Sequence, residues 1–160
     1  MADSPPRPLL GLLLRLAQQH WAQDIDAALA EAGFGDIRPP HANVFPFVGP
    51  DGIQVSELAQ RARIRKQSMA EAVEQLEELG YVERRPDPHD RRARLVFLTP
   101  RGEAVRPVSL ATGRRIEEQW GELVGQEEIA TLRATLEALL ASLSERGTTA
   151  QSAASTAERS

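Results

Sequence analysis

The 160-residue sequence contains no cysteine, and Lys66 is its only lysine beside eighteen arginines. Without thiols the chain has no disulfide, no thiolate metal site and no cysteine redox switch. It also lacks a run of the roughly 20 apolar residues that a membrane-spanning helix needs. Arg15 interrupts the apolar start of the chain, which is therefore a poor match to a signal peptide. We expect a soluble, cytoplasmic protein.

Residues typical of catalytic sites are equally scarce. The three histidines, His20, His41 and His89, fall in different parts of the chain, whereas acid–base catalysis needs such groups in a cluster. The motifs H-E-x-x-H and G-x-S-x-G and the P-loop do not occur. We predict that the protein is not an enzyme and uses no metal and no cofactor.

Apolar residues, in contrast, are numerous enough to build one core. Hydrophobic residues make up 41% of the chain, as in an ordinary globular domain. Periodic apolar patterns run from about Leu9 to Glu145. Residues 1–8 and 147–160 lack them, and we expect a flexible N-terminus and a disordered tail.

The N-terminal part predicts one long helix and one short one. Apolar residues recur at helical spacing before a stop signal at Gly33: Leu9, Leu12, Leu13, Leu16, Ile25 and Leu29. Pro39 and Pro40 then favour the start of a short second helix. Pro46 interrupts the pattern of that helix.

Two further helices are predicted at the C-terminal end, over Pro100–Val124 and Gln126–Glu145. Thr99 is a good cap for the first of them, and Pro107 should kink it near Glu103–Pro107 because proline removes a backbone hydrogen bond. The second helix carries a wide apolar stripe: Ile129, Leu132, Leu136, Leu139, Leu140 and Leu143. This stripe packs either in an ordinary core or against another subunit.

Two short helices stand close together in the middle of the chain. A first helix starts near Val55, and a second is marked by apolar residues at steps of three or four: Met69, Ala72, Val73, Leu76 and Leu79. Gly80 should end the second helix as a left-handed cap. Two such helices joined by a tight turn form a helix-turn-helix. The first is capped by Gln54 or, two residues later, by Ser56.

An arginine-rich hairpin follows the second helix. Tyr81 and Val82 begin a strand, RPDPHDRR is typical of a turn, and Leu95–Thr99 alternates as a returning strand. The stretch RRPDPHDRRARLVFLT holds five arginines in eleven residues. Residues 51–102 carry a net charge of +1 and the remainder carries -5, so that a weakly basic segment lies in an acidic chain.

These elements together resemble the MarR family of bacterial transcription regulators, over nearly all of residues 9–145. The residues that carry the resemblance are SELA at Ser56–Ala59, LEELGYVERR at Leu76–Arg85 and DPHDRRARLVFLTPRG at Asp87–Gly102. The resemblance implies a mostly α fold with a small β wing (α+β). It also implies homodimers, with residues 9–36 and 103–146 as helical dimerisation region and residues 37–102 as winged helix-turn-helix DNA-binding domain.

In helix-turn-helix proteins the start of the second helix enters the major groove of DNA. Here Gln67 can pair with adenine, and Glu71 can accept from cytosine if it faces the groove. Arg65 and Lys66 suit guanine or phosphate. Ser68 contacts DNA or caps the helix. Gln67 and Glu71 are otherwise ordinary exposed residues.

Members of the family place a wing arginine in the minor groove, held by an aspartate two positions before it. The matching residues here are Arg92 and Asp90. An arginine in this groove reads groove width and potential rather than a unique base. Arg91 and Arg94 are candidates for phosphate contacts.

The other polar residues of the hairpin have roles open to them besides DNA contact. Strand alternation sends Arg84 and Arg85 to opposite faces. One of them is expected to pair with an acid such as Glu83 or Asp87. His89 at the hairpin tip contacts DNA or is merely exposed.

Many relatives bind small aromatic or anionic ligands in a crevice between the dimerisation and DNA-binding regions. The residues here that either line such an effector pocket or pack in the core are His20, Trp21, His41, Phe45 and Phe47.

We predict a sequence-specific, DNA-binding transcription regulator. A homodimer would bind double-stranded DNA at a pseudo-palindromic operator, and a small-molecule effector would release it. We expect repression, with activation as the alternative. A winged-helix protein-interaction module that does not bind DNA is the other interpretation, and the nearly neutral charge of residues 51–102 favours it.

Overall fold

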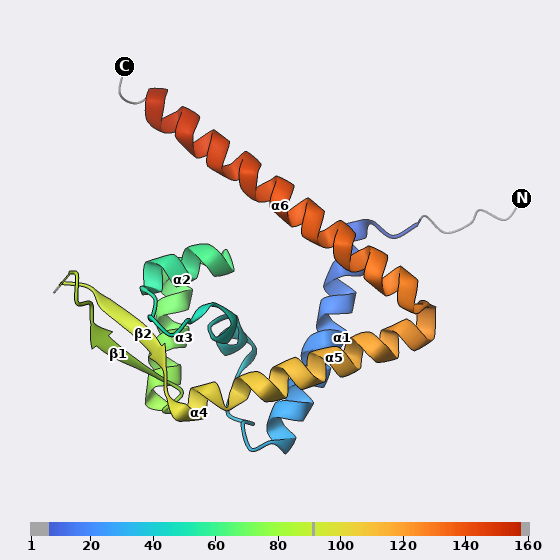
Figure 1. Ribbon diagram of the computed structural model, residues 1–160, viewed down its shortest axis with the longest axis horizontal. Helices are drawn as coiled ribbons and strands as arrows, with labels where there is room; N and C mark the ends of the chain where they lie inside the picture. The colour runs from blue at the N-terminus through green and yellow to red at the C-terminus, as the bar shows by residue number, and fades with distance from the viewer. Residues whose placement is uncertain (1–6, 91, 158–160) are drawn as a thin grey trace, which may run out of the picture. The chain divides into compact units, whose positions relative to one another are not determined.

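The computed structural model describes residues 7–90 and 92–157, with side chains as far as residue 146 (Figure 1). The chain divides into two compact units, Met1–Arg114 and Arg115–Ser160. The helices and strands, with η for 3-10 helices, are α1 (Leu10–Glu31), η1 (Pro39–Asn43), η2 (Phe45–Phe47), α2 (Val55–Ala62), α3 (Lys66–Glu78), β1 (Val82–Pro86), β2 (Arg94–Leu98), α4 (Pro100–Glu103), α5 (Val105–Val124) and α6 (Gln126–Ala157). This architecture confirms the predicted mostly helical fold with a small β wing.

The N-terminal helices follow the sequence pattern closely. α1 ends at Glu31, and Gly33 has a φ of +88°, in the left-handed region that favours glycine. The short second helix is divided into the two 3-10 turns η1 and η2, the first of which begins at Pro39. Pro46, within η2, has no N–H to extend a hydrogen-bonded helix across this segment. Of the expected flexible N-terminus, residues 1–6 lie outside the described part of the chain.

The helix-turn-helix consists of α2 and α3. Gln54, not Ser56, occupies the position before α2, and its side chain makes no capping hydrogen bond to that helix. Arg63, in the turn between the helices, has a φ of 54°. Gly80 has a φ of +77°, as expected for the residue that follows the C-cap of α3.

The wing is a two-stranded antiparallel hairpin. Val82 of β1 pairs with Leu98 of β2, and the register continues to Pro86 opposite Arg94. Ile53 adds a bridge to the same sheet, since it exchanges two backbone hydrogen bonds with Val96, at 3.1 and 2.8 Å. This bridge joins the wing to the chain just before α2.

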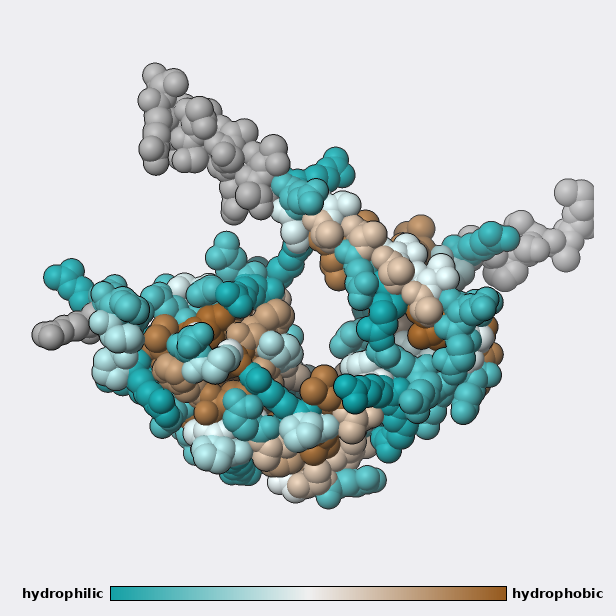
Figure 2. Space-filling view, in the orientation of Figure 1, coloured by the Kyte–Doolittle hydropathy of each residue, from teal (hydrophilic) through white to brown (hydrophobic). Residues whose placement is uncertain are grey.

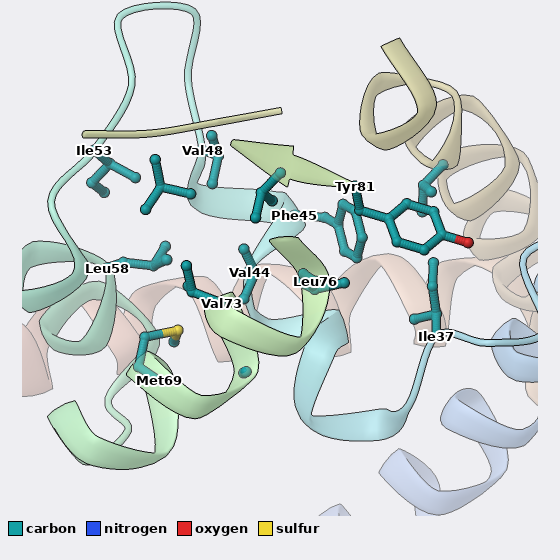
Figure 3. Packing of buried hydrophobic residues seen from close by; sticks show 14 of the residues in the cluster. Ile37, Val44, Phe45, Val48, Ile53, Leu58, Met69, Val73, Leu76 and Tyr81 are labelled. Atoms are coloured by element: carbon teal, nitrogen blue, oxygen red, sulfur yellow. The ribbon is translucent and has the colours of Figure 1, made fainter. Parts of the chain in front are cut away.

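One hydrophobic core holds the winged helix together. Figure 3 shows side chains from η2, α2, α3 and the connecting segments, with Tyr81 directly before the wing, pointing toward one another. Tyr81 is fully buried, and the rings of Phe34 and Phe45 stand edge-on to it at centroid distances of 6.2 and 6.0 Å. Each large apolar side chain buried in this way contributes roughly 1.5 to 3 kcal/mol. The core therefore positions α3 and the wing as one body.

The helix predicted over Pro100–Val124 is interrupted at Ala104, so that α4 and α5 are separate. Pro107 has no N–H to donate to the carbonyl of Glu103, four residues earlier. The kink predicted near Glu103–Pro107 corresponds to this break at Ala104. Thr99 caps α4 as predicted, because its Oγ1 accepts a hydrogen bond from the Gly102 N–H at 3.1 Å.

The second unit contains the end of α5 and α6, joined at Gly125, whose φ is +115°. α6 continues to Ala157, well beyond the predicted end at Glu145. The helix includes residues 147–157, for which the sequence predicted a disordered tail, while residues 158–160 lie outside the described part. This segment contains four alanines and no proline, so nothing strongly opposes extension of a helix already formed.

Exposed leucines remain on the helices at both ends of the chain. On α1 they are Leu10, Leu12, Leu13, Leu14 and Leu16, and on α6 they are Leu132, Leu139, Leu140 and Leu143. Four of the six residues in the predicted α6 stripe are thus exposed. Among the described helices, none is both long enough and apolar enough to cross a bilayer.

Candidate nucleic-acid interface

The first turn of α3 presents polar side chains to solvent. Arg65 is the N-cap residue, and Lys66, Gln67 and Ser68 follow it, all exposed. Because the helix begins at Lys66, Ser68 lies inside it, and the alternative that this serine caps the helix is wrong. The four residues predicted to enter the major groove are thus brought together on one accessible helix end.

The rest of the exposed face of α3 is acidic. Met69 and Val73 are buried on the opposite side of the helix. Gln67 donates a hydrogen bond through Nε2 to Glu71 Oε1 at 3.3 Å, and Glu74 is exposed on the same face. Positive charge on this helix is therefore confined to its N-terminal end.

Asp90 organises the tip of the wing through the backbone. Its Oδ1 accepts a hydrogen bond from the Arg92 N–H at 3.0 Å, and its carbonyl accepts from the Ala93 N–H at 2.9 Å. The expected partnership of Asp90 with Arg92 is present, although it holds the main chain rather than the guanidinium. The side chains of Arg92 and Arg94 are exposed, while Arg91 lies outside the described residues.

Both arginines at the base of the hairpin are paired. Arg85 forms the expected ion pair with Glu83 and lies over the ring of Phe97, 4.7 Å from its centroid. Arg84 pairs with Glu77 of α3, with 3.4 Å between Nε and Oε2. The second pairing was not predicted, because its partner lies on a different element.

Asp87, the other acid considered as a partner for these arginines, supports the wing in another way. It is buried and accepts hydrogen bonds from the His89 N–H at 2.8 Å and from Gln54 Nε2 at 3.4 Å. The backbone hydrogen bond from His89 is the largest of the effects that lower the pKa of Asp87 below its usual range. The side chain of His89 is exposed. Sequence reasoning missed this role of Asp87.

Several arginines in and next to the winged helix are neutralised by partners within the protein, and others there are not. Arg61, Arg101 and Arg106 bind acidic side chains or backbone carbonyls. In the part of the chain that the structure describes, side-chain hydrogen bonds and ion pairs are absent from Arg65, Lys66, Arg92 and Arg94. Hydrophilic side chains cover the wing, at the left of Figure 2. These four cations, on the α3 N-terminus and the wing, define the candidate interface.

The five residues expected around an effector pocket do not gather at one site. His41 is buried, its Nδ1 accepts from the Arg38 N–H at 3.0 Å, and its Nε2 lies 2.7 Å from Gln75 Oε1. Phe45 is buried against Tyr81. His41 and Phe45 therefore pack in the core, which was the alternative to lining an effector pocket.

The remaining three residues are more accessible. His20 is exposed, and the half-buried ring of Trp21 lies against Gly113, where an added Cβ would come within 3.1 Å of it. Phe47 lines a cavity of about 460 Å³ together with other residues of the first unit: Pro46, Val48, Gly49, Asp51, Gly52, Ile53, Glu57, Arg61 and Arg106. The described residues contain no group of three or more His, Asp or Glu side chains that could hold a metal.

Comparisons of the sequence with known proteins point to transcription regulators. The model of the MarR family matches residues 36–93. The transcriptional regulator HosA of Escherichia coli O111:H- is 32% identical over 92 residues, which cover 57% of this chain and 68% of HosA.

Solved structures share the fold. Wild-type MarR from E. coli in its apo form superimposes with a TM-score of 0.68 at 24% identity, covering 84% of this chain and 99% of that one. A mutant of S. aureus MepR bound to an oligodeoxyribonucleotide gives a TM-score of 0.55 at 19% identity, covering 86% and 99%. The matched winged helix, the level of identity with HosA and the shared fold lead to one conclusion: this chain belongs to the MarR family of winged-helix transcription regulators.

Proposed function

We propose that this regulator binds a specific DNA sequence through the first turn of α3 and the wing. The observation that carries the proposal is the set of four exposed cations, Arg65, Lys66, Arg92 and Arg94, which lack partners among the described residues. Cations that are neutralised within the protein contribute little to phosphate binding, whereas free ones release counterions from DNA. The oligodeoxyribonucleotide bound to the MepR mutant supports the proposal.

Each element has a distinct role in the proposed complex. Arg65 and Lys66 contact guanine or phosphate in the major groove, where Gln67, Ser68 and Glu71 face base edges. In the wing, Arg92 enters the minor groove from the turn that Asp90 holds, and Arg91 and Arg94 contact phosphates.

The regulator acts as a homodimer in this proposal. Residues 9–36 and 103–146 form the dimerisation region, and residues 37–102 form the DNA-binding domain. The exposed leucines of α1 and α6 support an apolar contact between subunits, because a monomer rarely leaves such patches in water. Two recognition helices would then read half-sites roughly 10 base pairs apart in a pseudo-palindromic operator.

Binding near a promoter represses transcription, in the cytoplasm where bacterial DNA lies. A small-molecule effector releases the DNA by favouring another spacing of the two recognition helices. The effector binds in the cavity beside Phe47 and Arg106, which combines an aromatic ring with cationic and anionic groups.

Affinity for the promoter region beside the protein's own gene, measured across a salt series, tests the proposal. Replacing Arg92 by alanine should weaken binding and reduce the slope of log K against log salt by about one. Arg7→Ala removes the same charge from a position before α1 and should leave the slope as it is. Absence of binding at low salt would contradict the proposal. It would favour the interpretation as a protein-interaction module, which the acidic face of α3 also supports.

A further inference from the structure

Three side chains from distant parts of the first unit meet beside the base of the wing. Asp36 lies in the connection between α1 and η1, Tyr81 lies between α3 and β1, and Arg101 lies on α4. We refer to Asp36, Tyr81 and Arg101 as the clip. None of these residues belongs to the proposed DNA contacts.

Arg101 makes four interactions at once. Its Nη1 donates to the carbonyl of Leu79 at 2.6 Å, and its Nη2 donates to Asp36 Oδ2 at 2.8 Å and to Tyr81 Oη at 3.1 Å. Its guanidinium also lies over the Tyr81 ring, with Cζ 4.2 Å from the centroid. A lysine cannot reproduce this set, because only the planar fork of arginine both stacks on a ring and donates in several fixed directions.

Tyr81 links the clip to the core. Its ring is fully buried, and its hydroxyl donates a hydrogen bond to Asp36 Oδ1. Burial and the neighbouring carboxylate raise the pKa of Tyr81 to about 12. The Tyr81 hydroxyl is also the main cause that lowers the pKa of Asp36. The clip is therefore a connected polar network that is formed only when all three segments are in place.

The clip joins the points at which the DNA-reading elements are anchored. Leu79 is the C-cap residue of α3, and Tyr81 directly precedes β1. Thr99, which follows β2, donates through Oγ1 to the Gly80 carbonyl at 2.6 Å, so both ends of the wing are tied to the same place. The described contacts thus fix the far end of α3 and the base of the wing against the Asp36 segment.

We propose that Arg101 is a positioning residue for DNA binding, which through the clip sets the direction of α3 and of the wing without touching DNA. This inference rests on the proposed DNA-binding function. At 1.5 Å per residue, the first turn of α3 lies about 18 Å from its anchored end, and a tilt of about 5° there would displace it by roughly 1.5 Å. Base recognition tolerates displacements of only about 0.5 Å.

Asp36→Asn separates positioning from simple charge effects. Removal of a negative charge alone would strengthen binding to DNA, whereas loss of positioning would weaken it. We expect operator affinity to fall by about 10-fold, the equivalent of one charge-assisted hydrogen bond. Asp24→Asn removes the same charge from an exposed position of α1 and measures the charge effect by itself.

Arg101→Ala separates positioning from direct DNA contact. We expect a similar loss of affinity with an unchanged salt slope, whereas a lost phosphate contact would lower that slope by about one. A lower slope, or unchanged affinity in both variants, would overturn the inference. If the unmodified protein binds no DNA at low salt, the proposed function fails and this inference fails with it.

The chain contains one tyrosine, so the clip has its own spectroscopic signal. Ultraviolet titration of tyrosinate should show Tyr81 ionising at lower pH in Asp36→Asn, because the variant loses the charged acceptor that raises its pKa. The same titration on Asp24→Asn should match the unmodified protein. A titration that Asp36→Asn leaves unchanged would contradict the clip geometry even where affinity falls.

Discussion

Gln54 Nε2 donates a hydrogen bond to Asp87 Oδ2 across 3.4 Å and thereby links the residue before α2 to the end of the wing's first strand. The same carboxylate accepts from the His89 N–H at 2.8 Å, inside the turn that leads to the wing tip. One buried acid therefore connects the helix-turn-helix to the turn that carries Arg92.

Replacing Asp87 by alanine should lower the melting temperature and weaken operator binding, because the His89 N–H and the Gln54 amide lose their acceptor. The pKa of Asp87 is lowered in the folded state, so its contribution is present above the ordinary value of 3.8 and is lost as pH falls below it. Between pH 7 and pH 3 the melting temperature should therefore fall less steeply for the variant than for the unmodified protein. Asp87→Asn keeps one acceptor oxygen, so its melting temperature should lie between those of the two other proteins. An equal fall of the melting temperature with pH in Asp87→Ala and the unmodified protein would contradict the prediction.

Tyr81→Phe should lower the free energy of unfolding at neutral pH by about 1 kcal/mol, because it removes the hydroxyl that donates to Asp36 and keeps the ring. The pKa of Tyr81 is raised from 10.0 to about 12 on folding, so its stabilisation is complete below pH 10 and is lost as pH rises toward 12. Urea denaturation at pH 8 and at pH 11 checks this: the gap between the two proteins should narrow at pH 11. A larger difference in the free energy of unfolding at pH 11 than at pH 8 would contradict the predicted direction of the pH dependence.

Gly102→Ala should destabilise the winged helix by about 2 kcal/mol, because overpacking of a rigid site costs roughly 1 to 3 kcal/mol. A Cβ at this position would overlap the carbonyl oxygen of Tyr81 and lie 3.3 Å from Leu98 Cβ, and backbone cannot move aside cheaply. Denaturant midpoints measure the loss. Gly11→Ala is the matched control, because a Cβ there meets nothing within 4 Å and alanine favours the helix. Equal midpoints for the two variants would refute the steric argument.

Leu140→Glu should convert the proposed homodimer into a monomer. Leu140 is 55% exposed on α6, so a charge there costs an isolated chain little, whereas burial of that charge in a subunit contact is expensive. Light scattering at micromolar concentration should show the molar mass halved, with the helical circular dichroism retained. Glu137→Gln, an exposed change on the same helix, should remain dimeric. A dimer that persists in Leu140→Glu would place the interface elsewhere.

Local patterns determined most of the elements from the sequence alone. The apolar repeats that predicted α1 and α3, the glycine stops at Gly33 and Gly80 and the Thr99 cap are set by neighbours within four residues, so they can be read without a structure. The same holds for the exposed first turn of α3, whereas the partnership of Asp90 with Arg92 was an expectation from the resemblance to the MarR family.

Only the tertiary structure decided which charged and aromatic residues remain free for function. Arg84 is held by Glu77 and Arg101 by Asp36, a residue 65 positions away, and no periodic pattern reports such pairs. His41 likewise became a buried hydrogen-bonding residue through Gln75, 34 positions along the chain. Secondary structure follows from short-range hydrogen bonds and apolar spacing, whereas the partner of a long side chain depends on which distant segments the core brings together.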